Sequence, residues 1–364
     1  MMQMATEMLN FTVGPVTGAE DILAIGAEQV PYFRTPEFSH MMLENERMVL
    51  ELAGAPAGSR AVFLTGSGTA SMEASVASLL GDTDRALVVD GGSFGHRFVE
   101  ICQIHGIEHE VVVPRVGCSI TLEDLEVHAG HGCTALLIQV DETSTGVLHN
   151  MDVVGEFCRE QGMLLIADAV SAFLADPVDM AAWGVDALLT GSQKALACPP
   201  GVSIVMLSPR GVERAMAGSS GMMYLDLASA LVNGERGQTP FTCAVGTLRQ
   251  IHARLAGIVE AGGAQVEVER CAALAADFRQ KIAAFPFEIS SESLPNGVTP
   301  LHTPKNNAMD IFATLKDEYG IWICPNGGAM AKSHFRVGHL GALTTKHNDA
   351  LIAALESMRS RGLL

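Results

Sequence analysis

The sequence of 364 residues has no uninterrupted apolar run of about 18 residues, the length that a membrane-spanning helix requires. Its beginning, MMQMATEMLNF, also lacks the basic region and the apolar segment that together form a secretion signal. From these two absences we predict a cytoplasmic protein with no membrane partner.

Positive charge is scarce, since 23 Lys and Arg residues stand against 41 Asp and Glu residues, which gives a net charge of −18. Nucleic acid and anionic membrane surfaces repel a protein of this charge, so we expect neither to be a partner. A small anionic ligand is still compatible with the composition, because the residues of a local pocket can oppose the net charge.

No two cysteines stand in a C-x-x-C pair, and several of the eight lie inside apolar runs. We therefore interpret them as reduced core thiols rather than as a disulfide framework or a zinc site. The twelve histidines show no metal-binding spacing either, so we predict no metal. The cysteines are Cys102, Cys118, Cys133, Cys158, Cys198, Cys243, Cys271 and Cys324.

Apolar residues make up 48% of the sequence, which is enough for a large core. Through the middle of the chain, short apolar runs alternate with helix-like stretches. This alternation is typical of β-α-β units, so we predict an α/β protein with a mainly parallel sheet that is buried on both faces. The runs are Ala61–Thr65, Ala86–Asp90, Glu110–Val113, Ala135–Val140, Met163–Ala167, Ala187–Thr190 and Val202–Leu207.

The pattern changes after about residue 246. Helical spacing predicts two long helices, over 247–261 and 266–284, and a final helix over 347–358. Shorter strands are expected at Phe287–Ser290, Asn307–Phe312 and His334–Val337. We therefore predict an N-terminal arm (1–20), a large domain (21–250) and a small C-terminal α+β domain (251–364).

Three motifs follow predicted strands. Thr65–Thr69 (TGSGT) sits where a strand turns into a helix, and the backbone N–H groups of such a turn favour an anion. It is neither a Walker A loop nor G-x-G-x-x-G, and a tight turn with a Thr cap is the alternative. Asp168 ends an apolar strand, where open α/β sheets bind ligands, although a helix-capping carboxylate fits equally well.

The third motif is Lys194, which follows a strand and stands between small residues and a Pro-Pro-Gly. A solvated surface lysine is the alternative interpretation. Twenty-six positions separate it from Asp168, so one strand–helix–strand passage would bring both to the same sheet edge. A lysine amine, a carboxylate and an anion cradle are together what pyridoxal phosphate (PLP) needs for its aldehyde, its ring nitrogen and its phosphate.

On these motifs the sequence resembles the class V aminotransferases of fold type I, in particular alanine–glyoxylate and 2-aminoethylphosphonate–pyruvate aminotransferases. The resemblance covers nearly the whole chain, and it makes 21–250 the PLP-binding domain. The matching segments are FTVGPV (11–16), YFRTPEF (32–38), GSGTASMEA (66–74), DETSTGVLHN (141–150), ADAVSA (167–172), GSQKAL (191–196), PPG (199–201), QTPFT (238–242) and FRVGHLG (335–341).

The resemblance implies that Lys194 forms the Schiff base with PLP and acts in catalysis together with Asp168, which pairs with the ring nitrogen. Arg336 would bind the substrate carboxylate. The implied cofactor-binding residues are Ser67, Gly68, Thr69, Phe94, Thr143, Asp168, Val170, Gln193, Lys194 and Thr239.

The resemblance also implies which part of the cofactor most of these residues would contact. Ser67–Thr69 and Gln193 would hold the phosphate, and Phe94 would stack on the ring. Thr143 would contact the 3-hydroxyl of the ring. Thr239 would reach the phosphate in the neighbouring subunit, so the resemblance also implies a homodimer.

We therefore predict a PLP-dependent transaminase that moves an amino group from a small donor, of the alanine or serine type, to glyoxylate or pyruvate. A 2-aminoethylphosphonate–pyruvate transaminase is the alternative, with Arg34 or Lys332 as a cation for the phosphonate. A cysteine desulfurase or lyase is less expected, because Gln193 stands where a His typically precedes the lysine and because we interpret Cys324 as a buried thiol. A non-catalytic PLP-binding protein is the last alternative.

Overall fold

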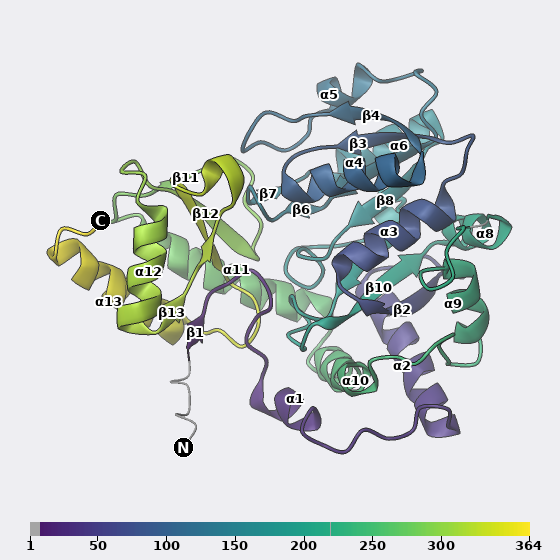
Figure 1. Cartoon of the computed structure of the whole chain (residues 1–364), viewed down its shortest axis with the longest axis horizontal. Helices are drawn as coiled ribbons and strands as arrows, with labels where there is room; N and C mark the ends of the chain where they lie inside the picture. The colour runs from purple at the N-terminus through teal and green to yellow at the C-terminus, as the bar shows by residue number, and fades with distance from the viewer. Residues whose placement is uncertain (1–7, 219) are drawn as a thin grey trace.

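The computed structural model describes residues 8–218 and 220–364, so the first seven residues of the predicted arm lie outside the described residues. A seven-stranded sheet forms the centre of the larger part, in the order β2-β10-β9-β8-β5-β3-β4 (Figure 1). Within this sheet β10 runs antiparallel to the other six strands, which confirms the mainly parallel sheet. The strands are β2 (Arg60–Gly66), β3 (Arg85–Val89), β4 (Glu108–Val112), β5 (Ala135–Gln139), β8 (Leu164–Asp168), β9 (Ala187–Gly191) and β10 (Gly201–Leu207).

Helices cover both faces of this sheet, as parallel strands joined by crossover helices require. The first group of helices, α2, α6, α7 and α10, packs on one face, and α3, α4, α8 and α9 pack on the other. The helices of this part are α1 (Glu20–Ile25), α2 (Pro36–Leu52), α3 (Gly68–Leu79), α4 (Ser93–His105), α5 (Leu122–Glu126), α6 (Met151–Gln161), α7 (Met180–Trp183), α8 (Pro209–Ala217), α9 (Leu227–Gly234) and α10 (Val245–Glu260).

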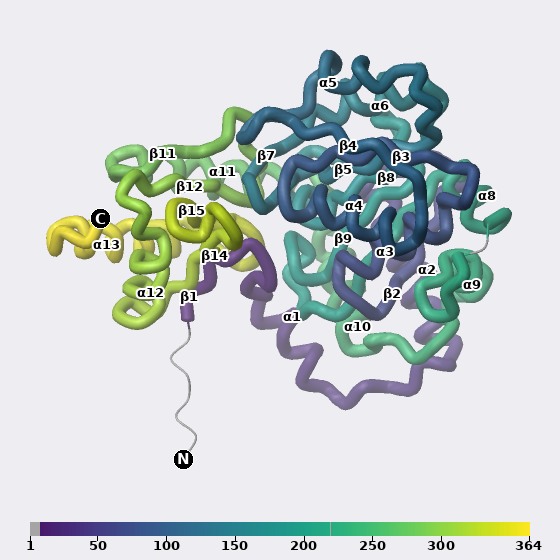
Figure 2. The backbone as a smooth tube through the Cα atoms, turned by 45° about the horizontal axis from the view of Figure 1, so that its top comes forward, coloured from purple at the N-terminus to yellow at the C-terminus, as the bar shows by residue number. Residues whose placement is uncertain are grey.

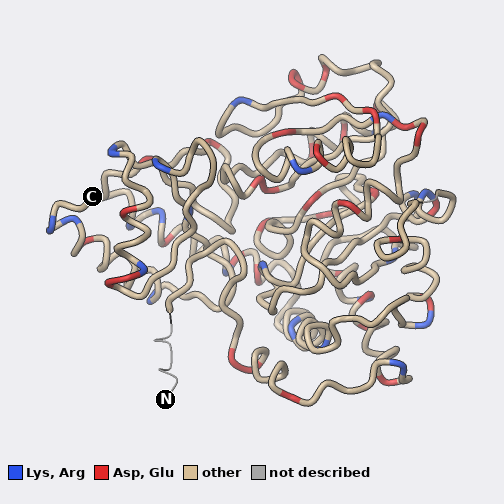
Figure 3. Tube along the Cα trace, viewed as in Figure 1, with Lys and Arg blue, Asp and Glu red and all other residues tan. Residues whose placement is uncertain are grey.

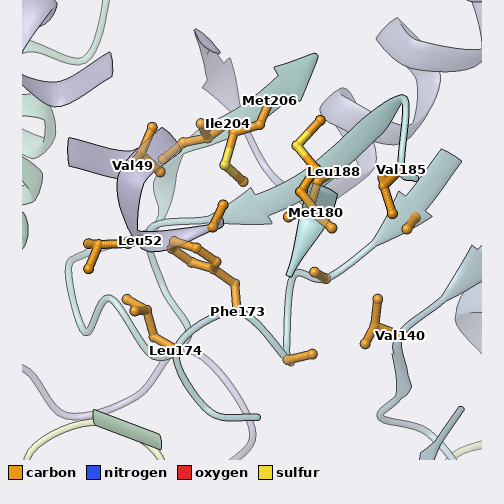
Figure 4. Packing of buried hydrophobic residues seen from close by; sticks show 14 of the residues in the cluster. Val49, Leu52, Val140, Phe173, Leu174, Met180, Val185, Leu188, Ile204 and Met206 are labelled. Carbon is orange, nitrogen blue, oxygen red and sulfur yellow. The ribbon is translucent and has the colours of Figure 1, made fainter. Parts of the chain in front are cut away.

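The core shows why the strands are apolar along their whole length. In β5, Leu136 and Ile138 join the cluster on one face, and Ala135 and Leu137 join the cluster on the other. Successive side chains of a strand point to opposite faces, so a strand buried on both sides needs apolar residues at every position. Figure 4 shows part of the first cluster, where Phe173 lies among the side chains of the first face.

A smaller α+β part carries an antiparallel sheet in the order β11-β12-β15-β14, with a third core cluster of its own. The tube in Figure 2 shows this part beside the larger one, with the N-terminal segment running between them. Its elements are β11 (Glu288–Ile289), β12 (Val298–His302), β13 (Ile321–Trp322), β14 (Cys324–Pro325), β15 (His334–Gly338), the 3-10 helix Gly328–Met330, α11 (Ala264–Ile282), α12 (Ala308–Tyr319) and α13 (Thr345–Ser360).

One strand prediction in this part is wrong. Asn307–Phe312 was expected to be a strand, but it lies at the start of α12, and β12 supplies the missing strand. Ala308, Ile311 and Leu315 are buried on one side of the helix, which is the spacing of a helical face rather than of a strand. The predicted domain boundary at residue 250 falls inside α10, and that division of the chain stays a prediction.

The N-terminal segment links the two parts. Its short strand β1 (Leu9–Asn10) pairs with β13, and the chain then passes to the edge of the large sheet. Beyond Gln139, two further short strands, β6 (Asp141–Glu142) and β7 (Val147–Leu148), pair with each other. No helix among the described residues combines the length and the apolar composition needed to cross a membrane. Basic residues are scattered over both parts (Figure 3).

Candidate active site

A cavity of 340 Å³ opens at the carboxyl ends of the parallel strands. Nine of the sequence-predicted site residues line it, whereas Thr239 and Arg336 do not. The predicted residues in its wall are Ser67, Gly68, Thr69, Phe94, Thr143, Asp168, Val170, Gln193 and Lys194. The other lining residues are Gly14, Pro15, Met72, Arg97, Asp141, Ser171 and Pro200.

The turn between β2 and α3 forms one wall. Ser67 is the N-cap of the twelve-residue helix α3, and its hydroxyl makes no capping bond, so Thr69 is not the cap that the alternative interpretation required. A Cβ on Gly68 would come within 2.9 Å of Cγ2 of Val170, so this close approach requires a glycine. The oxygen Oε1 of Gln193 is buried without a hydrogen-bond partner in the described structure. The wall therefore presents unused polar groups at a helix N-terminus.

Asp168 and Lys194 meet at the same sheet edge, because β8 and β9 are adjacent parallel strands. The carboxylate of Asp168 accepts from the backbone N–H of Val170 at 2.9 Å, and burial raises its pKa to about 6. The amine of Lys194 donates to the carbonyl of Val13 at 2.6 Å, and burial lowers its pKa. A buried amine of lowered pKa is a better nucleophile toward a carbonyl group than a solvated lysine.

The N-terminal segment holds Lys194 in place. Gly14 has φ of +132°, and a Cβ at this position would lie 2.7 Å from Cδ of Lys194. A side chain at this position would therefore be strained and would also displace the lysine.

Phe94 lies at the start of α4. The backbone N–H groups of Phe94 and Gly95 donate to the carboxylate of Glu142, at 3.1 and 2.8 Å, which fixes the helix end against the strand that follows β5. The guanidinium of Arg97 lies 4.9 Å from the centroid of the Phe94 ring and donates to the hydroxyl of Thr69 at 3.2 Å. Arg97 therefore brings a positive charge to the wall that the β2–α3 turn forms.

Arg336 reaches the edge of the site from the small sheet. It is 9% exposed, and its Nη1 donates to the backbone carbonyl of Thr143 at 3.0 Å. Its Nε donates to Asn326, and its Nη2 contacts the sulfur of Cys324 at 3.2 Å. The hydroxyl of Thr143 in turn donates to that of Ser171 at 2.6 Å. Arg336 thus stands behind the cavity wall and contacts a residue that forms it.

Thr239 lies away from the cavity of its own chain. Its hydroxyl donates to the carbonyl of Phe241, and Arg34 donates to the carbonyls of Thr239 and Pro240 and to Gln238. The predicted reach of Thr239 toward a neighbouring subunit stays a prediction.

The cysteines correct one part of the sequence interpretation. All eight are free, but four of them are only partly buried, and Cys324 is one of these rather than a buried thiol. The exposure arises because its two-residue strand β14 lies at the edge of the small sheet. The other partly buried cysteines are Cys118, Cys133 and Cys243.

Sequence reasoning missed Gly14, Arg97 and Asp141. Asp141 had a usable signal, because it follows the apolar run 135–140 just as Asp168 follows 163–167. Gly14 and Arg97 had no such signal in the sequence. Gly14 comes to the cavity from the N-terminal segment, and Arg97 comes from the second turn of α4. Their roles depend on contacts rather than on a local pattern.

A second polar cluster lies at β4, the outer edge of the large sheet. His128 and His131 both contact the carboxylate of Glu110, and their ligand atoms lie within 4.8 Å of one another. The same carboxylate pairs with Arg85 at 2.9 Å, and this fixed positive charge opposes a metal cation. The cluster is therefore an ion-pair network in this structure.

The cavity residues fit PLP. They include a buried amine, a buried carboxyl group and a helix N-terminus with unused donors and acceptors, which match the aldehyde, ring nitrogen and phosphate of that cofactor. The unpartnered Oε1 of Gln193 shows that Gln193 still has hydrogen-bonding capacity in this wall. The fold and the cavity together define a PLP-dependent enzyme.

Comparison with known proteins identifies the family. Residues 32–321 match the class-V aminotransferase family, so the chain belongs to the class-V aminotransferases and is a PLP-dependent transaminase. It is 30% identical over 352 residues to the soluble hydrogenase 42 kDa subunit of Anabaena cylindrica, covering 94% of this chain and 91% of that protein. It is 28% identical over 325 residues to L-aspartate–glyoxylate aminotransferase of Paracoccus denitrificans, covering 85% and 81%.

The solved structures agree with this assignment. The aspartate aminotransferase of subgroup IV from Thermus thermophilus superimposes with a TM-score of 0.88 at 27% identity, covering 97% of this chain and 99% of that one. This match extends over both sheets and includes the smaller part of the chain.

The raised pKa of Asp168 predicts how the stability of the cofactor-free protein depends on pH. Its pKa is 3.8 ordinarily and about 6 in the folded protein, so the folded state holds a proton that the unfolded state has lost. The free energy of unfolding should therefore fall by about 3 kcal/mol as the pH rises from about 4 to about 6. Asp168→Asn should lose this part of the pH dependence.

Urea unfolding of cofactor-free protein across this pH range measures the effect as the difference between the two proteins. Glu156→Gln, which changes an exposed acid on α6, is the matched control and should follow the wild type. An Asp168→Asn protein with the full wild-type dependence would contradict the raised pKa.

Proposed function

We propose that this transaminase moves the amino group of a small donor, of the alanine or serine type, to glyoxylate or pyruvate, and that it works as a cytoplasmic homodimer. The observation that carries the substrate class is the size of the cavity. At 340 Å³ it lies at the lower end of the roughly 300–1,000 Å³ typical of ligand sites, and the cofactor must share it with the substrate.

Lys194 is the residue that we assign to the covalent attachment of the cofactor and to proton transfer. When bound, PLP supplies an electron sink for the electrons that the Cα–H bond releases. Lys194 would hold the aldehyde of PLP, and its amine, when free, would act as the base and acid that moves the substrate Cα proton. Asp168 keeps a proton on the ring nitrogen, since its buried carboxylate needs a positive partner.

The remaining cavity residues hold the cofactor in this proposal. Ser67–Thr69 and Gln193 bind the phosphate, for which the N-terminus of α3 is suited. Phe94 stacks on the ring, and Val170 packs at its other side. Thr143 contacts the 3-hydroxyl. These assignments are supported by the position of all of these residues in the cavity lining.

Arg336 is the residue that we propose for the substrate carboxylate. Its bonds to Asn326 and to the carbonyl of Thr143 fix the plane of the guanidinium against the cavity wall. A planar guanidinium fork can hold a carboxylate with two hydrogen bonds, which would orient the Cα–H bond toward Lys194. Arg336, Arg34 and Lys332 all lie outside the cavity lining, but among the described hydrogen bonds only those of Arg336 reach a lining residue, Thr143. This contact favours a carboxylate substrate over a phosphonate, for which Arg34 and Lys332 were the cations considered.

The dimer is supported by apolar surface near the segment 238–242. Tyr32 is 69% exposed and Met223 is 80% exposed, and Tyr224 stacks on Phe241 at 5.3 Å. Aromatic and methionine side chains gathered in this way are typical of interfaces. The free thiols of all eight cysteines support a cytoplasmic location.

Two alternatives fit less well. A desulfurase needs a free, mobile cysteine, whereas the sulfur of Cys324 contacts Nη2 of Arg336. A non-catalytic PLP-binding protein would have no need for the buried Lys194 and Asp168 at one sheet edge.

The first prediction of this proposal is that PLP is attached to Lys194. Borohydride reduction of the loaded protein followed by peptide mapping should find the pyridoxyl group on Lys194. Lys194→Ala should lose at least about 10³-fold in rate, because it removes both the attachment and the proton transfer. Lys332→Ala, which changes an exposed lysine, is the control. A pyridoxyl group on another lysine would refute the assignment.

The second prediction concerns Arg336. Arg336→Ala should raise KM for alanine by about 10²-fold or more while PLP stays bound, because the carboxylate loses its charged partner. The KM for 2-aminoethylphosphonate, which has no carboxylate, should change much less. Steady-state kinetics with both donors measure this. If only 2-aminoethylphosphonate reacts with the loaded wild-type enzyme, the proposed substrate class is wrong.

The third prediction is a dimer with shared sites. Light scattering should show two subunits per particle, and Thr239→Ala should weaken PLP binding by about tenfold, the effect of one lost hydrogen bond to a charged group. Thr83→Ala, at an exposed turn, should bind PLP as the wild type does. A fully active monomer would contradict this prediction.

A further inference from the structure

Asp141 is a cavity residue to which neither the sequence interpretation nor the proposed function gives a role. It is 4% exposed and lines the cavity, yet neither of its carboxyl oxygens has a hydrogen-bond partner among the described residues. Buried polar groups without partners are costly and uncommon. The cavity that Asp141 lines is the place from which such a partner can come.

The lining of the cavity shows where these side chains lie. Asp141, in the two-residue strand β6, and Thr143, in the turn that follows it, both line the cavity. Glu142, between them, points away and accepts from the backbone N–H groups of Phe94 and Gly95. Asp141 and Thr143 therefore belong to the wall of the same cavity, and Glu142 does not.

The charges around Asp141 decide its protonation. Three acids are near enough to act on its charge, namely Asp176, Glu142 and Asp168, and Lys194 is the nearby cation. Burial and the acids raise the pKa of Asp141 well above its ordinary value, and Lys194 opposes this only in part. Asp168 receives an N–H bond from Val170, whereas no described residue donates to Asp141. A hydrogen-bond donor stabilises the ionised form of a carboxyl group. We therefore assign the negative charge to Asp168, which has such a donor, and the proton to Asp141.

The covalent structure of PLP indicates which atom lies near Asp141. Its ring nitrogen and the carbon that bears the aldehyde lie opposite each other, and they separate an edge with the phosphate arm from an edge with the 3-oxygen. In the proposed assignment, Asp168 and Lys194 would hold the first two positions and Ser67–Thr69 would hold the phosphate; all of these residues line the cavity. The edge with the 3-oxygen would then lie toward the remaining lining residues Thr143 and Asp141.

We propose that Asp141 is a further cofactor-binding residue, whose protonated carboxyl group donates a hydrogen bond to the 3-oxygen of PLP beside Thr143. This inference rests on the proposed attachment of PLP to Lys194. A donor at the 3-oxygen withdraws electron density from it, and this weakens the hold of that oxygen on the proton of the Lys194–PLP linkage. The protonated carboxyl group therefore makes the linkage more acidic.

The test is a pH titration of the absorbance band of the lysine-bound cofactor. Asp141→Ala removes the donor and should raise the pKa of the linkage by about one unit, a tenfold change in proton affinity. Asp141→Asn keeps an N–H donor and should stay within about half a unit of the wild type. If Asp141 were ionised, both variants would lose a negative charge beside the linkage and would lower its pKa, which would overturn the proposal.

Glu156→Gln is the control, because it removes an exposed acid on α6 that is not among the groups that act on the charge of Asp141. It should leave the titration unchanged, and a shift as large as that of Asp141→Ala would overturn the assignment to Asp141. If Asp141→Ala does not fold, infrared spectra of the cofactor-free wild type and of Asp141→Asn still show whether Asp141 is protonated. A protonated-carboxyl band that is absent from Asp141→Asn supports the proposal, and the absence of this difference contradicts it.

The two failures are distinguishable. If the wild type forms no absorbance band with PLP, or if the band survives in Lys194→Ala, the proposed function itself fails. If the band depends on Lys194 but shifts in the opposite direction in the Asp141 variants, only the role of Asp141 fails.

Discussion

The burial of one lysine amine among carboxyl groups is the constraint on which this site depends. Lys194 lies below the surface, and its amine has one hydrogen bond, to the carbonyl of Val13. Burial removes these groups from the water that would solvate their charged forms. It therefore lowers the pKa of the Lys194 amine and raises the pKa of the two cavity acids, Asp141 and Asp168. The lowered pKa makes the amine reactive, and the shortage of hydrogen-bond partners leaves these groups able to bind a ligand.

The parallel sheet makes this burial achievable. Because β8 and β9 are neighbours that run in the same direction, Asp168 and Lys194 reach one edge without any unusual backbone between them. The apolar clusters on both faces exclude water from the strand ends. Gly68 then lets the N-terminus of α3 approach Val170, so that the polar turn before this helix forms one wall of the cavity.

The smaller part of the chain positions residues around the site and does not supply Lys194 or Asp168. Its strand β15 sends Arg336 to the carbonyl of Thr143, and β1, paired with β13, leads the chain to Val13 and Gly14 beside the lysine. The reactive edge of the large sheet is therefore held by two segments that are anchored in the small part. A movement between the two parts would change the surroundings of Lys194 directly.

The sequence by itself determined the parallel sheet and the meeting of Asp168 with Lys194, because strand periodicity and the polar residues that follow strands are local patterns. It misassigned Asn307–Phe312, where apolar residues suit either a strand or a helix until Ile311 and Leu315 are seen packed on one face. Only the tertiary structure decided that Gly14 packs on Lys194, that Arg336 stands behind the cavity wall, and that the carboxyl group of Asp141 has no hydrogen-bond partner in the part of the chain that the structure describes. Contacts between distant segments and the absence of a hydrogen bond depend on the folded geometry, which no local pattern of residues encodes.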